Sequence, residues 1–151
     1  MSARMQSPAA VLPGLTKAIG GIYQAMHAGG APAELLELVH LRASQINGCT
    51  YCAHAGASNL RKAGESDERL WTIAAWRDAP YFTDAERAAL ALTEAVTRIA
   101  DKGTVPDDVW DDAADHFDEK SLAAIITMIA TTNFFNRLNV TVRQPVGTSW
   151  S

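Results

Sequence analysis

The sequence lacks the long apolar runs and the excess of positive charge that would indicate a membrane or a nucleic-acid partner. No apolar run approaches the ~20 residues needed to cross a bilayer, and residues 1–14 lack the apolar stretch of a secretory signal. Its 13 lysines and arginines against 17 acidic residues leave a net charge of −4, whereas phosphate-backbone binding requires clustered cations. We therefore expect a cytoplasmic protein with no membrane and no nucleic-acid partner.

Cysteine is also scarce, because Cys49 and Cys52 are the only two in 151 residues. A disulfide between them would close a very small loop and constrain little chain, and a cytosolic environment would tend to reduce it. A structural zinc site needs four ligands, and the four histidines include no H-x-x-x-H pair. We expect no metal and no cofactor, and two readings stay open: inert core thiols or a working pair.

The sequence has no alternating pattern of strand length, whereas its apolar residues recur at helical spacing. Thr83-Asp84-Ala85-Glu86 has the form of a capping box. The length fits one domain, so we predict an all-α, single-domain helical bundle over residues 1–151 with about six to seven helices. These are expected over residues 15–26, 33–46, 49–63, 67–76, 84–102, 107–117 and 121–139.

The two cysteines open the third predicted helix. Residues three positions apart on a helix are about 300° apart and share one edge, so the two thiols can close into a disulfide with modest backbone adjustment. Unpaired N–H groups and the positive dipole end favour a thiolate in a first turn, and on position alone they favour Cys49 over Cys52. This environment suits a redox cysteine.

A longer pattern surrounds the pair. Residues 37–52, ELVHLRASQINGCTYC, place Glu37 twelve positions before Cys49 and put an Ile-Asn-Gly turn directly before it. This segment resembles the signature of the alkylhydroperoxidase D-like branch of the carboxymuconolactone decarboxylase family. The run AAWRDAPYFTDAERAALALTEAVT, residues 74–97, is also similar to the family. The resemblance covers about residues 33–140.

This resemblance implies an all-helical fold that assembles as a homo-oligomer, commonly a trimer or hexamer. It implies a thiol-dependent hydroperoxidase or disulfide reductase, with Cys52 peroxidatic, Cys49 resolving and Glu37 as a relay carboxylate. The implied partners are a peroxide and a thiol reductant, either dihydrolipoyl-like, thioredoxin-like or a peroxiredoxin. Lactone decarboxylation, the other activity of the superfamily, and a non-catalytic oligomeric module are the alternatives.

One position departs from the family pattern, because Gly56 stands where redox members usually carry a histidine. His54 lies about 200° around an ideal helix from Cys52, whereas His40 shares a face with Glu37 and can approach the thiols if that face packs on the third helix. Either histidine is a candidate for the missing base, His54 across a subunit contact or through a distorted first turn. Water and Tyr51 are the third candidate carrier of the proton. A histidine placed at position 56 is expected to speed up an enzyme limited by proton transfer.

The last predicted helix carries a polar stripe that its apolar neighbours make unusual. Buried amides need hydrogen-bond partners, so these residues can satisfy helix ends or line the thiol cleft. We assign no catalytic role to the stripe, which consists of Asn133, Asn136, Arg137 and Asn139.

Overall fold

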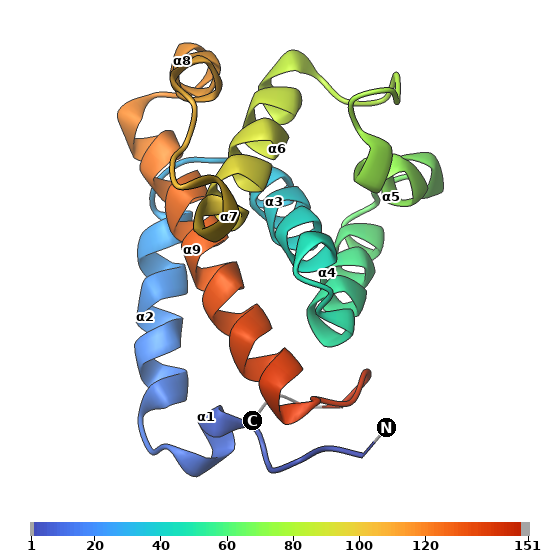
Figure 1. Cartoon of the computed structure of the whole chain (residues 1–151), viewed down its shortest axis with the longest axis vertical. Helices are drawn as coiled ribbons and strands as arrows, with labels where there is room; N and C mark the ends of the chain where they lie inside the picture. Colours follow the sequence, from blue (N-terminus) through green and yellow to red (C-terminus); the bar gives the residue numbers. More distant parts are fainter. Residues whose placement is uncertain (1, 149–151) are drawn as a thin grey trace.

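The computed structural model describes residues 2–148, and that part of the chain is helical with no strand (Figure 1). Residues 1 and 149–151 of the predicted domain lie outside it. None of the helices in the described part has the length and apolar character needed to cross a membrane. The elements are α1 (Pro8–Val11), α2 (Leu15–His27), α3 (Ala33–Ile46), α4 (Thr50–Lys62), α5 (Asp67–Thr72), the 3-10 helix η1 (Ile73–Ala75), α6 (Asp84–Thr97), α7 (Ile99–Lys102), α8 (Asp107–His116) and α9 (Glu119–Val142).

The all-helical prediction is confirmed, but the predicted number of helices is wrong. Residues 2–148 form nine α-helices, not six to seven. The helix expected over residues 84–102 breaks at Arg98, whose φ of −97° and ψ of 17° interrupt it between α6 and α7. The four-residue α1 begins after Ser7, whose side chain accepts the Ala9 N–H. Such short turns bury no periodic stripe, so a search for helical spacing cannot detect them.

Helix α3 lies at the centre of the fold. It packs against α4, α6 and α9 (Figure 1), and Leu36, Val39 and Ala43 are completely buried. One apolar cluster joins α3 to α2, α6, α8 and α9, and a second joins it to α4, η1 and α6. Since α3 is covered on several sides, its polar residues can reach partners on different helices. It therefore links the thiol region to the rest of the molecule.

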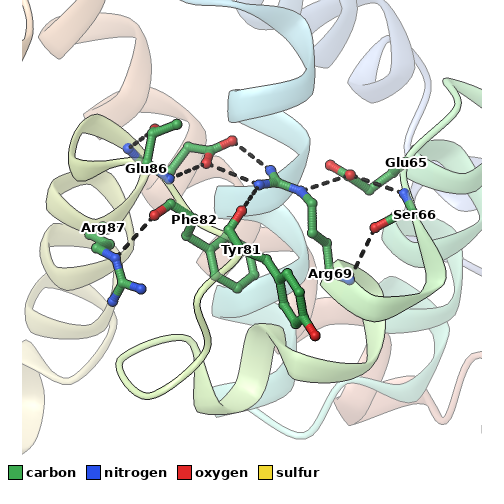
Figure 2. A network of polar contacts seen from close by, with 8 residues as sticks. Glu65, Ser66, Arg69, Tyr81, Phe82, Glu86 and Arg87 are labelled. Atoms are coloured by element: carbon green, nitrogen blue, oxygen red, sulfur yellow. Dashed lines mark hydrogen bonds and ion pairs between the residues drawn. The ribbon is translucent and has the colours of Figure 1, made fainter.

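Arg69 on α5 ties the end of α4 to the start of α6. Its guanidinium lies 2.7 Å from Glu65 and 2.5 Å from Glu86, and it also donates to the Tyr81 carbonyl (Figure 2). Glu86 in turn accepts the Thr83 N–H while the Thr83 hydroxyl accepts the Glu86 N–H. The predicted capping box is thus confirmed, and the same carboxylate fixes the entry of α6 next to α5.

Candidate active site

A tight turn places the two cysteines at the start of α4. Gly48 adopts a positive φ of 66°, which costs glycine little, and the Cys49 N–H bonds to the Ser44 carbonyl at 3.0 Å. Cys49 is then the N-cap of α4, because its Sγ accepts the Cys52 N–H at 3.3 Å. The Asn-Gly sequence predicts this turn. The helix begins one residue later than expected, since Cys49 caps it from outside.

Cys52 lies in the first turn with only 2% of its surface exposed. Asn139 on α9 donates its side-chain N–H to the Cys52 Sγ at 3.2 Å. Hydrogen bonds from the Cys49 thiol and from Asn139 lower the pKa of Cys52 to about 7, against the opposing effect of burial. Donation of its proton to Cys52, together with burial, raises the pKa of Cys49. The negative charge therefore belongs to Cys52, in the reverse of the order expected from the helix dipole alone.

His40 on α3 holds the backbone of this turn. Its Nε2 lies 3.2 Å from the Cys52 carbonyl oxygen and its Nδ1 3.2 Å from the Thr132 hydroxyl. A carbonyl can only accept, so Nε2 carries the hydrogen and donates it to the Cys52 oxygen, while Nδ1 lies within hydrogen-bond distance of the Thr132 hydroxyl. Both ring nitrogens are engaged by groups other than the Cys52 sulfur. His40 thus connects the first turn of α4 to Thr132 on α9.

Gly56 explains why no histidine follows Cys52 at the usual spacing. Gly56 is buried where α4 packs against α3, and a Cβ there would lie 3.0 Å from His40 Cδ2 and 3.2 Å from Leu41 Cβ. Both distances are tighter than ordinary contacts, so a side chain at 56 requires α3 and α4 to shift. The rate increase expected for a histidine at this position stays a prediction, and its side chain would have to share this space with His40.

A pocket of about 340 Å³ opens beside Cys52. Half-buried Glu37 faces it and accepts a hydrogen bond from Asn59 at 3.3 Å. Burial raises the pKa of Tyr23 to about 12, with Glu37 and Cys52 adding to the effect, so its hydroxyl stays protonated and can donate. The residues lining the pocket come from α2, α3, α4 and α9: Tyr23, Glu37, His40, Tyr51, Cys52, Ala55, Asn59, Phe135 and Asn139.

The structure brings together most, but not all, of the residues predicted for the site. Cys52, Glu37 and His40 line one pocket, and Cys49 adjoins Cys52. His54 is exposed and is not among the pocket residues. Within residues 2–148, no three His, Cys, Asp or Glu side chains gather as a metal site would require. The arrangement suits thiol chemistry with a carboxylate and a phenol nearby.

Sequence reasoning did not identify Tyr23 as a site residue, and it did not identify the contact between Asn139 and Cys52. Tyr23 lies four positions after Ile19 and three before Met26, and both of these are buried, so its place on the inner stripe of α2 was readable from spacing. Asn139 belongs to the predicted polar stripe, but its contact with Cys52 joins residues 87 positions apart. Periodicity within one helix cannot reveal such a contact.

Comparisons with known proteins identify the family of the chain. The model of the carboxymuconolactone decarboxylase family matches residues 13–95. The uncharacterised protein YdfG of Bacillus subtilis (strain 168) is 35% identical over 104 residues, which cover 69% of this chain and 70% of that protein. The family predicted from the cysteine signature is thereby confirmed.

Solved structures show the same fold over nearly the whole chain. ATU0492 of Agrobacterium tumefaciens, a protein of unknown function proposed to be the antioxidant defence protein AhpD, superimposes with a TM-score of 0.89 and 30% identity, covering 98% of this chain and 100% of that one. The apo debrominase Bmp8 gives a TM-score of 0.79 at 23% identity over 90% of this chain and 73% of its own, which is a likeness of fold alone. The chain is an alkylhydroperoxidase D-like member of the carboxymuconolactone decarboxylase family.

Proposed function

We propose that the protein is a thiol-dependent hydroperoxidase that cycles Cys49 and Cys52 between dithiol and disulfide. The observation that carries the proposal is the pairing of a buried Cys52, with its pKa lowered to about 7, and a protonated Cys49 beside it at the edge of a pocket. A thiolate is the nucleophile in such chemistry. The likeness to ATU0492, proposed to act in antioxidant defence, supports the same direction.

The first half of the cycle takes place in the Cys52 pocket. The Cys52 thiolate attacks one peroxide oxygen, the O–O bond breaks, and Cys52 becomes a sulfenic acid while an alkoxide or hydroxide leaves. The Tyr23 hydroxyl lines the same pocket and can donate to the leaving oxygen. Glu37, which accepts a hydrogen bond from Asn59, serves as the carboxylate that relays a proton from solvent to this leaving oxygen.

The second half restores the thiols. Cys49 gives up its proton, its sulfur attacks the Cys52 sulfur, and the sulfenic oxygen departs as water. Two equivalents of a reductant thiol then convert the protein disulfide to the dithiol. The sum is one hydroperoxide and two thiols giving one alcohol, one water and one disulfide, with two electrons transferred.

We also propose that the chain works as a homo-oligomer. Helices α2 and α9 leave an apolar groove between them, and two of its residues, Ile22 and Phe134, are 42% and 41% exposed. A contiguous exposed apolar surface of this kind is typical of an interface. Light scattering on the purified protein measures the assembly, and a strictly monomeric mass at micromolar concentration would contradict it.

Peroxide consumption by single-cysteine variants tests the proposed chemistry. Cys52→Ser should lower turnover by about 10³-fold or more, because the nucleophile is gone, whereas Cys49→Ser should trap a sulfenic acid or a mixed disulfide on Cys52. In the wild type, peroxide should remove two hydrogens from the mass, and dithiothreitol should restore them. The rate should rise with pH through about 7, as the Cys52 thiolate forms.

His54→Ala is the matched control, because this exposed histidine lies outside the pocket. We expect the variant to retain wild-type turnover. Native thiols that stay unreactive toward peroxide would overturn the hydroperoxidase proposal. Full activity on a lactone in both cysteine variants would favour a decarboxylase instead, since that reaction needs no thiol pair.

A further inference from the structure

The two thiols line different pockets. Cys52 lines the 340 Å³ pocket, whereas Cys49 lines a second pocket of about 670 Å³ between the start of α4, the end of α9 and the two terminal segments. Tyr51 and Asn139 contribute to both pockets and so form the wall between them. Each cysteine is 2% exposed, so exposure does not rank the two sulfurs. The pocket that each one lines does distinguish them.

The second pocket is positively charged, although the chain as a whole is acidic. Arg4 and Arg143 line it, and among residues 2–148 no aspartate or glutamate does. Arg4 is fixed to the end of α9, because its Nη1 donates to the Thr141 carbonyl at 3.0 Å and its backbone N–H to the Val142 carbonyl at 2.9 Å. The start of α4 adds the positive end of a helix dipole.

Arg143 has an unusual backbone for a charged residue. It ends α9 with a φ of 56°, and among residues 2–148 it is the one residue other than glycine with a positive φ. Glycine is the common choice at such a position, since it adopts this conformation without strain. An arginine adopts this backbone conformation at a higher energy than glycine. At this position it places a cation at the wall of the second pocket.

The direction of thiol–disulfide exchange links each sulfur to its own pocket. The attacking, attacked and leaving sulfurs become collinear, so a thiolate that attacks Cys49 must approach from the side away from Cys52. Cys49 lines the second pocket and Cys52 does not, so a thiol seated in that pocket meets Cys49 first. The exchange is faster when the leaving thiolate is stabilised. The Asn139 amide donates to the Cys52 Sγ at 3.2 Å, and this donor does not depend on the Cys49 proton. Geometry and leaving-group ability therefore select the same sulfur.

We propose that a small thiol bearing a carboxylate enters the second pocket beside Arg4 and Arg143 and reduces the protein by attacking Cys49, while peroxide meets Cys52 in the first pocket. This inference rests on the proposed dithiol cycle and adds its reductant site. The reductant sulfur bonds to Cys49 Sγ, the Cys49–Cys52 bond breaks, and Cys52 leaves as a thiolate. A second reductant thiolate attacks the reductant sulfur of the mixed disulfide, and Cys49 leaves and takes up a proton.

Trapping the mixed disulfide tests which sulfur is attacked. The disulfide is first formed with diamide rather than peroxide, so the test does not depend on peroxide turnover. The oxidised protein is mixed briefly with mercaptopropionate, quenched in acid and alkylated with iodoacetamide. Fragmentation of the peptide that contains both cysteines should locate mercaptopropionate on Cys49 and the alkyl group on Cys52. Mercaptopropionate located mainly on Cys52 would overturn the proposal.

A matched neutral probe tests the charge of the site. Mercaptopropionamide replaces the carboxylate of mercaptopropionate with a neutral amide. Because the carboxylate also raises the pKa of its own thiol, the two rates are compared per thiolate, and we expect the anion to react roughly tenfold faster on that basis at low salt. Arg4→Gln combined with Arg143→Gln should remove most of this preference, while Arg143→Lys, which keeps the charge, should retain it. Equal rates for the two probes in the wild type, or an undiminished preference in the double variant, would overturn the proposed anion site.

Discussion

One buried polar cluster surrounds Glu94 and another surrounds Cys52, and α3 contributes a residue to each. The two clusters differ in the groups that stabilise the negative charge. Glu94 Oε1 accepts from Arg42 at 2.8 Å and from the Trp76 indole at 2.9 Å, and its Oε2 lies 2.6 Å from Arg77. Arg98 approaches the same Oε2 at 3.4 Å. The Cys52 sulfur instead receives an amide and a thiol hydrogen and borders a pocket.

The two pKa values show what this difference means. Burial would raise the pKa of Glu94, but hydrogen bonds from Arg77, Trp76 and Arg42 outweigh it and lower the pKa to about 2. Its charge is therefore permanent at neutral pH and serves to join α3, the segment that follows η1, and α6. Weaker donors leave the pKa of Cys52 at about 7, where a sulfur is both ionised and still nucleophilic. The ion pairs of Glu94 thus hold helices together, whereas the weaker hydrogen bonds to Cys52 leave its pKa near neutral pH.

The largest effect is expected from a substitution that disrupts the cluster around Glu94. Glu94→Gln leaves Arg42, which is largely buried, without its anion and should cost about 3–5 kcal/mol of unfolding free energy in urea at pH 7. In the wild type, the low folded pKa of Glu94 means that stability is present above about pH 4.5 and is lost as pH falls toward 2, an amount of roughly 3 kcal/mol. The variant should lack this acid dependence. An unchanged urea midpoint would contradict the structural role.

The next effect disturbs the packing behind the thiol cluster. Gly56→Ala places a methyl group against His40 and Leu41 and should cost about 1–3 kcal/mol by overpacking. Gly20→Ala is the matched control, because nothing lies within 4 Å of its added Cβ in α2, and helix propensity should stabilise it by about 0.5–1 kcal/mol. Thermal unfolding distinguishes them, and equal shifts for both variants would contradict the close contact of α3 with α4.

A smaller effect is expected when the hydrogen bond that stabilises the Cys52 thiolate is removed and the thiol itself is kept. Asn139→Ala deletes the amide donor to Sγ and should raise the pKa of Cys52 by about one unit, as expected for a lost hydrogen bond to a charged sulfur. Absorbance at the thiolate band measures the titration. Asn133→Ala removes an amide of the same helix that donates to Thr97 and Ile129 and accepts from Asn47 and Arg137. Neither thiol is among these partners, so we expect the pKa of Cys52 to be unchanged in this variant.

The smallest expected effect concerns an exposed ion pair that belongs to neither cluster. Arg61 and Asp67 lie 2.8 Å apart, but the arginine side chain is 68% exposed. Arg61→Ala should change the unfolding free energy by no more than about 0.5 kcal/mol. A loss comparable to that of Glu94→Gln would mean that burial does not separate the strong ion pairs of this protein from the weak ones.

The same contrast separates what the sequence could predict from what it could not. Helix periodicity located most helices, and the turn at Gly48 with the spacing of Cys49 and Cys52 indicated the thiol site. Short α1 and α7 have too few residues to show a period. Glu94 was missed because its partners Arg42 and Arg77 come from other segments, and three-dimensional pairing alone distinguishes it from a solvated helical glutamate.

The cap of α4 has a consequence beyond folding. Helices usually begin with a serine, threonine, aspartate or asparagine, whose capping oxygen is chemically inert. In this protein the acceptor for the Cys52 amide is the sulfur of Cys49, so oxidation of the pair replaces a thiol acceptor with a disulfide sulfur. Under the proposed dithiol cycle, the local opening of residues 49–53 depends on the redox state of the pair, and amide hydrogen exchange at Cys52 measures that state.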